Sequence, residues 1–147
     1  MNDLSPRSKI SLAILAMALA ACASVNVGLS GANESPSVNT SASGKGHINV
    51  HTDGWVTGWI TTTGVKGTAA HLHTGAAGTN GPVAVPLVRN DSERSALMVN
   101  GDEGWSVPHN ARLTAAQYES FKKGELYVNV HSAANKAGEV RGQLKPY

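Results

Sequence analysis

Short runs of alternating apolar and polar residues dominate most of this chain. In residues 46–51, two apolar side chains fall on one face of an extended strand and three polar ones fall on the other. Asp53 and Gly54 follow, a pair favoured in tight type I′ hairpin turns. Residues 55–61 are therefore predicted to return as the partner strand of a β-hairpin.

The same alternation marks several further strands, which are separated by turn residues. The candidates are residues 68–73, 83–89, 96–100, 125–131 and 138–144. Residues 30–46 are rich in Ser, Gly and Asn, and we expect a loop or a loose edge strand there. So many short strands at this spacing predict an all-β fold, an antiparallel Greek-key sandwich or barrel.

One short helix interrupts the strands, and its signals agree with one another. Thr114 is a favourable N-cap, and Gln117 stands three residues later, which completes a capping box. Phe121 continues the apolar stripe, and Gly124 can adopt the left-handed conformation that ends a helix. We expect this helix to cover one end of the β-structure.

The N-terminus has the features of an export signal. Arg7 and Lys9 precede an uncharged run over residues 10–21, which is too short to span a bilayer as a permanent helix. Residues 19–22, Leu-Ala-Ala-Cys, resemble the lipobox of bacterial lipoproteins, and Cys22 is the only cysteine. We expect residues 1–21 to be a cleaved lipoprotein signal peptide and Cys22 to be acylated; cleavage of an ordinary signal near Ala23 is the alternative.

The mature chain, residues 22–147, has the length of one domain and almost no net charge. Loss of the signal leaves ten basic and nine acidic residues, and the whole chain has seven aromatic residues, so nucleic-acid binding has little support. The membrane, through the lipid anchor, is the expected partner, and a protein ligand is an open alternative. No acidic residue follows Cys22 directly, which by resemblance to Gram-negative lipoproteins favours the outer membrane, facing the periplasm or the cell surface.

Three histidines are candidate metal ligands. His71 and His73 are two residues apart in a predicted strand and so point to the same side, and His131 ends a second strand. If the two strands are neighbours, three imidazoles meet, a set that suits copper and, less well, zinc. A fourth ligand could come from His47, His51 or His109. The plainer alternative is that these histidines are ordinary solvated side chains.

Four segments together resemble the chordin-type (CHRD) domain family. They are residues 29–36 (Leu-Ser-Gly-Ala-Asn-Glu-Ser-Pro), residues 70–83 with the pair His71 and His73, residues 124–131, and residues 138–144. The family usually has a proline shortly before the last segment, where this chain reads Asn-Lys-Ala at residues 135–137. The resemblance implies an extracytoplasmic β domain, found in bacterial surface proteins and in a secreted animal antagonist of growth factors. It implies no agreed reaction.

A looser resemblance links the histidines to copper/zinc superoxide dismutase. By that comparison His71, His73 and His131 match copper ligands, and Arg141 matches the arginine that attracts the anionic substrate. The departures are the lack of an internal disulfide and a segment after His73 that is too short for a zinc loop. A lipid-anchored, metal-holding binding module is therefore our first expectation, and a copper redox enzyme of dismutase type is the alternative. For Arg141, a surface ion pair with Glu139 is a simpler interpretation.

The tryptophans leave a further choice open. Trp55 and Trp59 lie on the same face of a predicted strand, as part of the core or as a platform for a ligand. For side chains of this size the core is the usual location. Trp105 stands near Gly104 and Pro108, which suggests a position at a rim.

Overall fold

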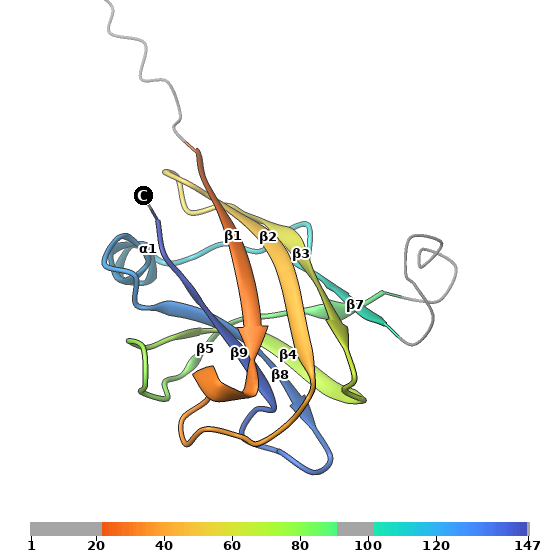
Figure 1. Cartoon of the computed structure of the whole chain (residues 1–147). Helices are drawn as coiled ribbons and strands as arrows, with labels where there is room; N and C mark the ends of the chain where they lie inside the picture. The colour runs from red at the N-terminus through yellow and green to blue at the C-terminus, as the bar shows by residue number, and fades with distance from the viewer. Residues whose placement is uncertain (1–21, 91–101, 147) are drawn as a thin grey trace, which may run out of the picture.

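The computed structural model describes residues 22–90 and 102–146 (Figure 1). Nine strands, one 3₁₀ helix and one α-helix lie in these residues. They are β1 (Cys22–Ser30), η1 (Gly31–Asn33), β2 (Ser43–His51), β3 (Val56–Thr63), β4 (Gly67–Thr74), β5 (Val83–Pro86), β6 (Val88–Arg89), β7 (Glu103–Ser106), α1 (Ala115–Lys122), β8 (Leu126–Ser132) and β9 (Val140–Leu144). The expected signal peptide at residues 1–21 and the expected strand at 96–100 lie outside the described residues.

The strands form one antiparallel sheet in the order β5-β4-β8-β9-β1-β2-β3-β7-β6. Its two outer strands, β5 and β6, belong to one continuous segment, residues 83–89. β5 pairs with β4, the Leu87 amide donates to the Ala70 carbonyl at 2.9 Å, and β6 pairs with β7. Because one segment is bonded to both ends of the sheet, the sheet closes into a barrel, which confirms the predicted all-β antiparallel class. Neighbours such as β9 and β1 require crossing connections of the Greek-key type.

The barrel interior is filled by the alternate apolar residues of the strands. Ile48 and Val50 of β2 and Leu72 of β4 are fully buried, as the alternation predicts. Trp105 is 3% exposed and lies in this core, so the rim position expected for it is wrong. Trp55 and Trp59 are 38% and 45% exposed, which also excludes the core as their location.

The hairpin between β2 and β3 forms as predicted, but its turn is of a different type. Gly54 has φ +90°, whereas no other residue type has positive φ in the described chain, so Asp53 does not adopt the conformation that a type I′ turn needs. The Gly54 amide donates to the His51 carbonyl, and the His51 amide donates to the Trp55 carbonyl, both at 2.9 Å. The connection is thus a longer loop that ends with a left-handed glycine.

The helix agrees with its sequence signals. The Gln117 amide donates to the Thr114 hydroxyl at 3.2 Å, and the Thr114 amide donates to the Gln117 side chain at 2.8 Å, so the capping box is complete. Phe121 is buried among the core residues, and α1 packs against β4 and β8. Gly124 has φ +73° directly after the helix. Within residues 22–90 and 102–146, no helix has the length and apolar character to cross a bilayer.

The sequence expectation for residues 30–46 is only partly right. β1 ends at Ser30 and β2 begins at Ser43, so the irregular region is shorter than expected. β1 itself, in which Val25, Val27 and Leu29 face inward, was not anticipated, and neither was β7. β1 lies between β9 and β2, where it joins the last strand of the chain to the first hairpin (Figure 1).

Candidate metal centre

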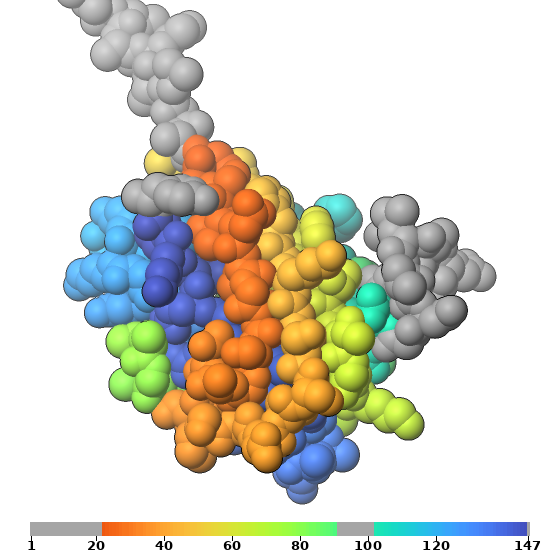
Figure 2. Space-filling view, in the orientation of Figure 1, coloured from red at the N-terminus to blue at the C-terminus, as the bar shows by residue number. Residues whose placement is uncertain are grey.

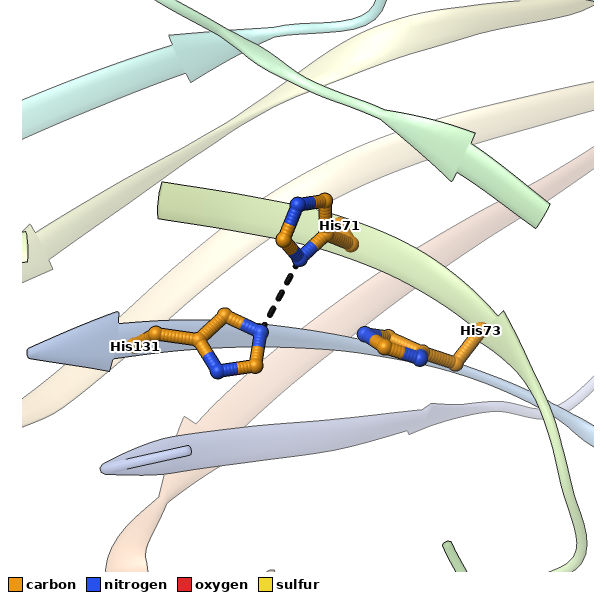
Figure 3. A group of neighbouring side chains, drawn as sticks. All are labelled: His71, His73 and His131. Atoms are coloured by element: carbon orange, nitrogen blue, oxygen red, sulfur yellow. Dashed lines mark hydrogen bonds between the residues drawn. The ribbon is translucent and has the colours of Figure 1, made fainter. Parts of the chain in front are cut away.

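The pairing of β4 with β8 brings the three predicted histidines together. In this register Ala69 lies opposite His131, and His73 lies opposite Tyr127. The side chains of His71, His73 and His131 all leave the outer face of the barrel and turn toward one another (Figure 3). One nitrogen of each ring lies within 4.8 Å of the corresponding nitrogens of the other two.

The rings of His71 and His73 are partly or almost wholly shielded from solvent, and this lowers their tendency to take up a proton. His73 is 7% exposed, and His71 is partly buried. Burial, followed by the proximity of the other two imidazoles, lowers the pKa of His71 below its ordinary value. Burial also lowers the pKa of His73, although its bond to the Gly81 carbonyl opposes the shift. Both rings are thus neutral at pH 7, the form that binds a metal ion.

Backbone carbonyls fix which nitrogen carries the proton in two of the rings. Nδ1 of His73 donates to the Gly81 carbonyl, and Nδ1 of His131 donates to the Lys136 carbonyl, each at 2.9 Å. Because a carbonyl can only accept, these Nδ1 atoms hold the protons and the Nε2 atoms keep free electron pairs. His71 then donates from Nδ1 to Nε2 of His131 at 2.9 Å (Figure 3).

Nε2 of His73 has no partner, and this is the atom that bears most directly on metal binding. It is buried and makes no hydrogen bond. A buried polar atom without a partner costs about 1–3 kcal/mol, so such atoms require an explanation. A metal ion between the three rings would bind this lone pair, and it would take the place of the proton shared by His71 and His131. The residues present therefore fit a metal ion.

Tyr127 fixes the plane of the His73 ring. The two rings stack with centroids 4.9 Å apart and planes 5° apart. The Arg141 guanidinium lies 3.5 Å from the centroid of the Tyr127 ring. The Tyr127 hydroxyl accepts a hydrogen bond from the Gly81 amide at 3.2 Å, so the same loop residue contacts both Tyr127 and His73.

Arg141 is buried beneath the loop that connects β4 to β5. It is 1% exposed, and its guanidinium donates to the carbonyls of Thr79 at 2.8 Å and Ala76 at 2.9 Å. It makes no ion pair with Glu139, which accepts from Thr40 at 2.9 Å, so the surface ion pair is wrong. Attraction of an anion by Arg141 stays a prediction, whereas its observed contacts hold the loop that carries Gly81.

A buried carboxyl group close to Arg141 was missed by the sequence reasoning. Glu34 is 7% exposed, and burial raises its pKa to about 7 despite the nearby Arg141 charge. A Cβ atom at Gly138 would collide with Glu34 Oε1 and with Asn129 Nδ2, so both side chains converge on this glycine. Glu34 appeared in the sequence only as part of the segment at residues 29–36, and no alternation singled it out.

The other histidines take no part in this cluster. Nδ1 of His47 donates to Asn26 at 2.8 Å on the outer face of β1 and β2, and Nε2 of His51 lies 3.7 Å from the sulfur of Cys22. His109 is exposed in the segment before α1. None of the three belongs to the group formed by His71, His73 and His131. A fourth protein ligand is therefore not supplied by the histidines that were expected to provide it.

Comparison with known proteins gives one match. The family model of the CHRD domain matches residues 25–144, a range that includes most of β1, the other eight strands and the three histidines. No curated protein and no solved structure matches the chain.

Proposed function

The chain belongs to the CHRD domain family, and on that premise we propose that it is an exported, lipid-anchored binding module that holds a copper ion through His71, His73 and His131. The convergence of three imidazoles from two strands is the observation that carries this proposal. The buried, unpartnered Nε2 of His73 supports it, because a bound ion would satisfy that atom.

The donor set favours copper over zinc. The site offers three imidazole nitrogens and no thiolate, and imidazole suits both metals. For a given set of nitrogen ligands, Cu²⁺ binds more tightly than the other divalent ions of the first transition row, so copper is the expected occupant outside the cytoplasm. The rings are fixed through the hydrogen bonds of His73 and His131 to backbone carbonyls, as is usual for metal-binding histidines.

Cys22 is the proposed point of attachment to the membrane. It is exposed, and it is the first residue of β1, at one end of the barrel. Acyl chains on one cysteine provide durable membrane affinity without help from the protein surface. We place the protein at the outer membrane, and mass spectrometry of the mature N-terminus, with radiolabelled palmitate in cells and a Cys22→Ser control, tests the anchor.

Metal analysis of protein purified without a histidine tag tests the site. Titration with Cu²⁺ and with Zn²⁺ is expected to give one bound ion per chain, tighter for copper, with an electron paramagnetic resonance spectrum typical of nitrogen ligands. His71→Ala and His131→Ala are expected to weaken copper binding by about a hundredfold. His47→Ala is the matched control, because that histidine lies outside the cluster and should leave binding unchanged.

Equal copper binding by His71→Ala, by His131→Ala and by the wild type would overturn the metal site. The dismutase-type enzyme remains the alternative expected from the looser resemblance, and it requires a coordination position that a small anion can reach. Superoxide consumption by the copper-loaded protein, compared with His131→Ala, distinguishes a redox enzyme from a binding module.

A further inference from the structure

The outer face of β1, β2 and β3 carries two exposed indoles in an otherwise polar surface. Trp55 and Trp59 are 38% and 45% exposed and project from the same side of the strand, with Thr57 between them. Figure 2 shows β1, β2 and β3 side by side on the face turned to the viewer. Large apolar side chains are normally buried. Two of them four residues apart on one outer face therefore indicate a binding surface.

The pairing registers define what surrounds the indoles. Asn26, His47 and Trp59 lie in one row across β1, β2 and β3. Gly28, Lys45 and Thr61 form the next row, and Ser24, Asn49 and Thr57 form the row on the other side. Apart from Gly28 and Lys45, these neighbours are amides, hydroxyls and an imidazole, which are groups that exchange hydrogen bonds with sugar hydroxyls.

A hollow lies beside Trp59 on this face. It has a volume of about 430 Å³, and its lining includes Asn26, Gly28, Lys45, His47 and Trp59. A Cβ atom added at Gly28 would meet nothing within 4 Å, so the strand lacks a side chain where the hollow is open. The hydrogen bond from His47 Nδ1 to Asn26 at 2.8 Å fixes both side chains before any ligand arrives.

Two basic side chains lie close to the indoles, whereas the carboxylates of Asp53 and Asp102, which accept from the Trp55 amide and the Thr63 hydroxyl, lie outside the three rows. Lys45 lines the hollow, and the Arg112 guanidinium lies 5.5 Å from the centroid of the Trp55 ring. The three rows of paired residues contain no carboxylate. In an extended strand Trp55 and Trp59 are about 13 Å apart, so a ligand that covers both must be elongated.

We propose that this surface binds an acidic polysaccharide, with sugar rings stacked on Trp59 and Trp55 and carboxylates facing Lys45. Sugars have apolar C–H faces for an indole and hydroxyls for the amides around it, and uronic acids add the charge that complements the lysine. The surface lies on β1–β3, away from the histidines of β4 and β8, so this activity is independent of the metal centre.

Calorimetric titration of the purified protein with a hexasaccharide of uronic acid units, at low salt, tests the proposal. Saturable binding is expected, and Trp59→Ala should weaken it by about tenfold or more with an unchanged melting temperature, because the indole is exposed. Lys45→Gln should weaken binding of the uronate and reduce its salt dependence. Val88→Ala, at a 56% exposed valine on β6, is the control and should change nothing.

Three outcomes would overturn sugar binding at this surface, and a fourth would refute its preference for an acidic sugar. The first is the lack of saturable uronate binding, and the second is equal binding by Trp59→Ala. The third is self-association of the wild type that Trp59→Ala abolishes, which would assign the surface to a second copy of the chain. Equal binding of a neutral glucose hexasaccharide would refute the acidic specificity. His71→Ala should bind the uronate normally, which separates this result from any failure of the metal site.

Discussion

At the scale of single residues, His73 is the best prepared of the three imidazoles. Its Nδ1 is bonded to Gly81, its face lies against Tyr127, and its Nε2 makes no hydrogen bond. His71 and His131 instead bond to each other. An incoming ion would therefore find one ligand already oriented and would displace one shared proton, which would reduce the free energy spent on ordering the proposed site.

The lowered pKa values of His71 and His73 predict how copper binding depends on pH. Protons compete with the metal only when these rings are protonated, which in this fold happens below the ordinary value of about 6.5. Copper should therefore be retained at pH 6.5 and lost at a clearly lower pH, as measured by electron paramagnetic resonance across a pH series. Loss of the ion above pH 7 would contradict the prediction.

Arg141→Met should destabilise the fold by about 3 kcal/mol. The substitution removes the hydrogen bonds that this buried, charged side chain donates to the carbonyls of Ala76 and Thr79 and to the Gln143 side chain, and hydrogen bonds from charged groups contribute about 1.5–3 kcal/mol each. Urea unfolding measures the loss. Arg89→Met is the control: Arg89 pairs with Glu103 at the surface with 46% of its side chain exposed, and its loss should cost less than about 1 kcal/mol.

Glu34→Gln should remove a pH-dependent contribution to stability. The pKa of Glu34 is raised to about 7 in the fold, above its ordinary value of 4.5. The unfolded chain therefore releases this proton first as pH rises, and stability is lost up to about pH 7. Glutamine stays neutral at every pH. The free energy of unfolding of the variant minus that of the wild type should therefore increase by on the order of 2 kcal/mol between pH 4.5 and pH 8. Identical pH profiles in urea unfolding would refute this assignment.

At the scale of elements, the sequence predicted correctly those features that depend only on residues close together in the chain. The capping box needs only Thr114 and Gln117, and the faces of β2 and β4 follow from alternation along each strand. The three candidate ligands could be predicted because His71 and His73 share a strand face. Their meeting with His131 depended on a pairing of β4 with β8 that the sequence suggested but could not establish.

Elements that depend on distant partners were harder to predict. β7 has only four residues and is a strand because β3 and β6 lie on either side of it. Arg141 could not be assigned to the loop near Gly81, because that contact joins residues more than sixty positions apart. The choice between core and outer face for Trp55 and Trp59 stayed open, because the usual burial of large side chains favours the core and only the pairing of the strands shows that this face is turned to solvent.

Thr114→Ala should lower stability by about 1 kcal/mol, since it removes the side chain that accepts from the Gln117 amide. Chemical denaturation provides the measurement. Thr114→Ser is the matched control, because serine keeps the hydroxyl and should retain most of the stability. An equal loss in both variants would mean that the capping bond is not the cause.

At the scale of the whole molecule, the barrel is closed by residues 83–89, which pair with β4 on one side and β7 on the other. β4 carries His71 and His73, so the candidate metal centre lies next to this closure. A ligand that binds only the folded chain stabilises it by about 2.7 kcal/mol at a hundred times its dissociation constant. Copper should therefore raise the melting temperature of the wild type, and this rise should disappear in His131→Ala.

The closed ring also has a kinetic consequence. The pairing of β4 with β8 joins His71 to a partner 60 positions away, and such non-local contacts form slowly because the intervening chain must first be ordered. An ion shared by these two strands would oppose their separation during unfolding. Its largest effect would then be on the lifetime of the native state, because the bound metal would lower the unfolding rate of the barrel.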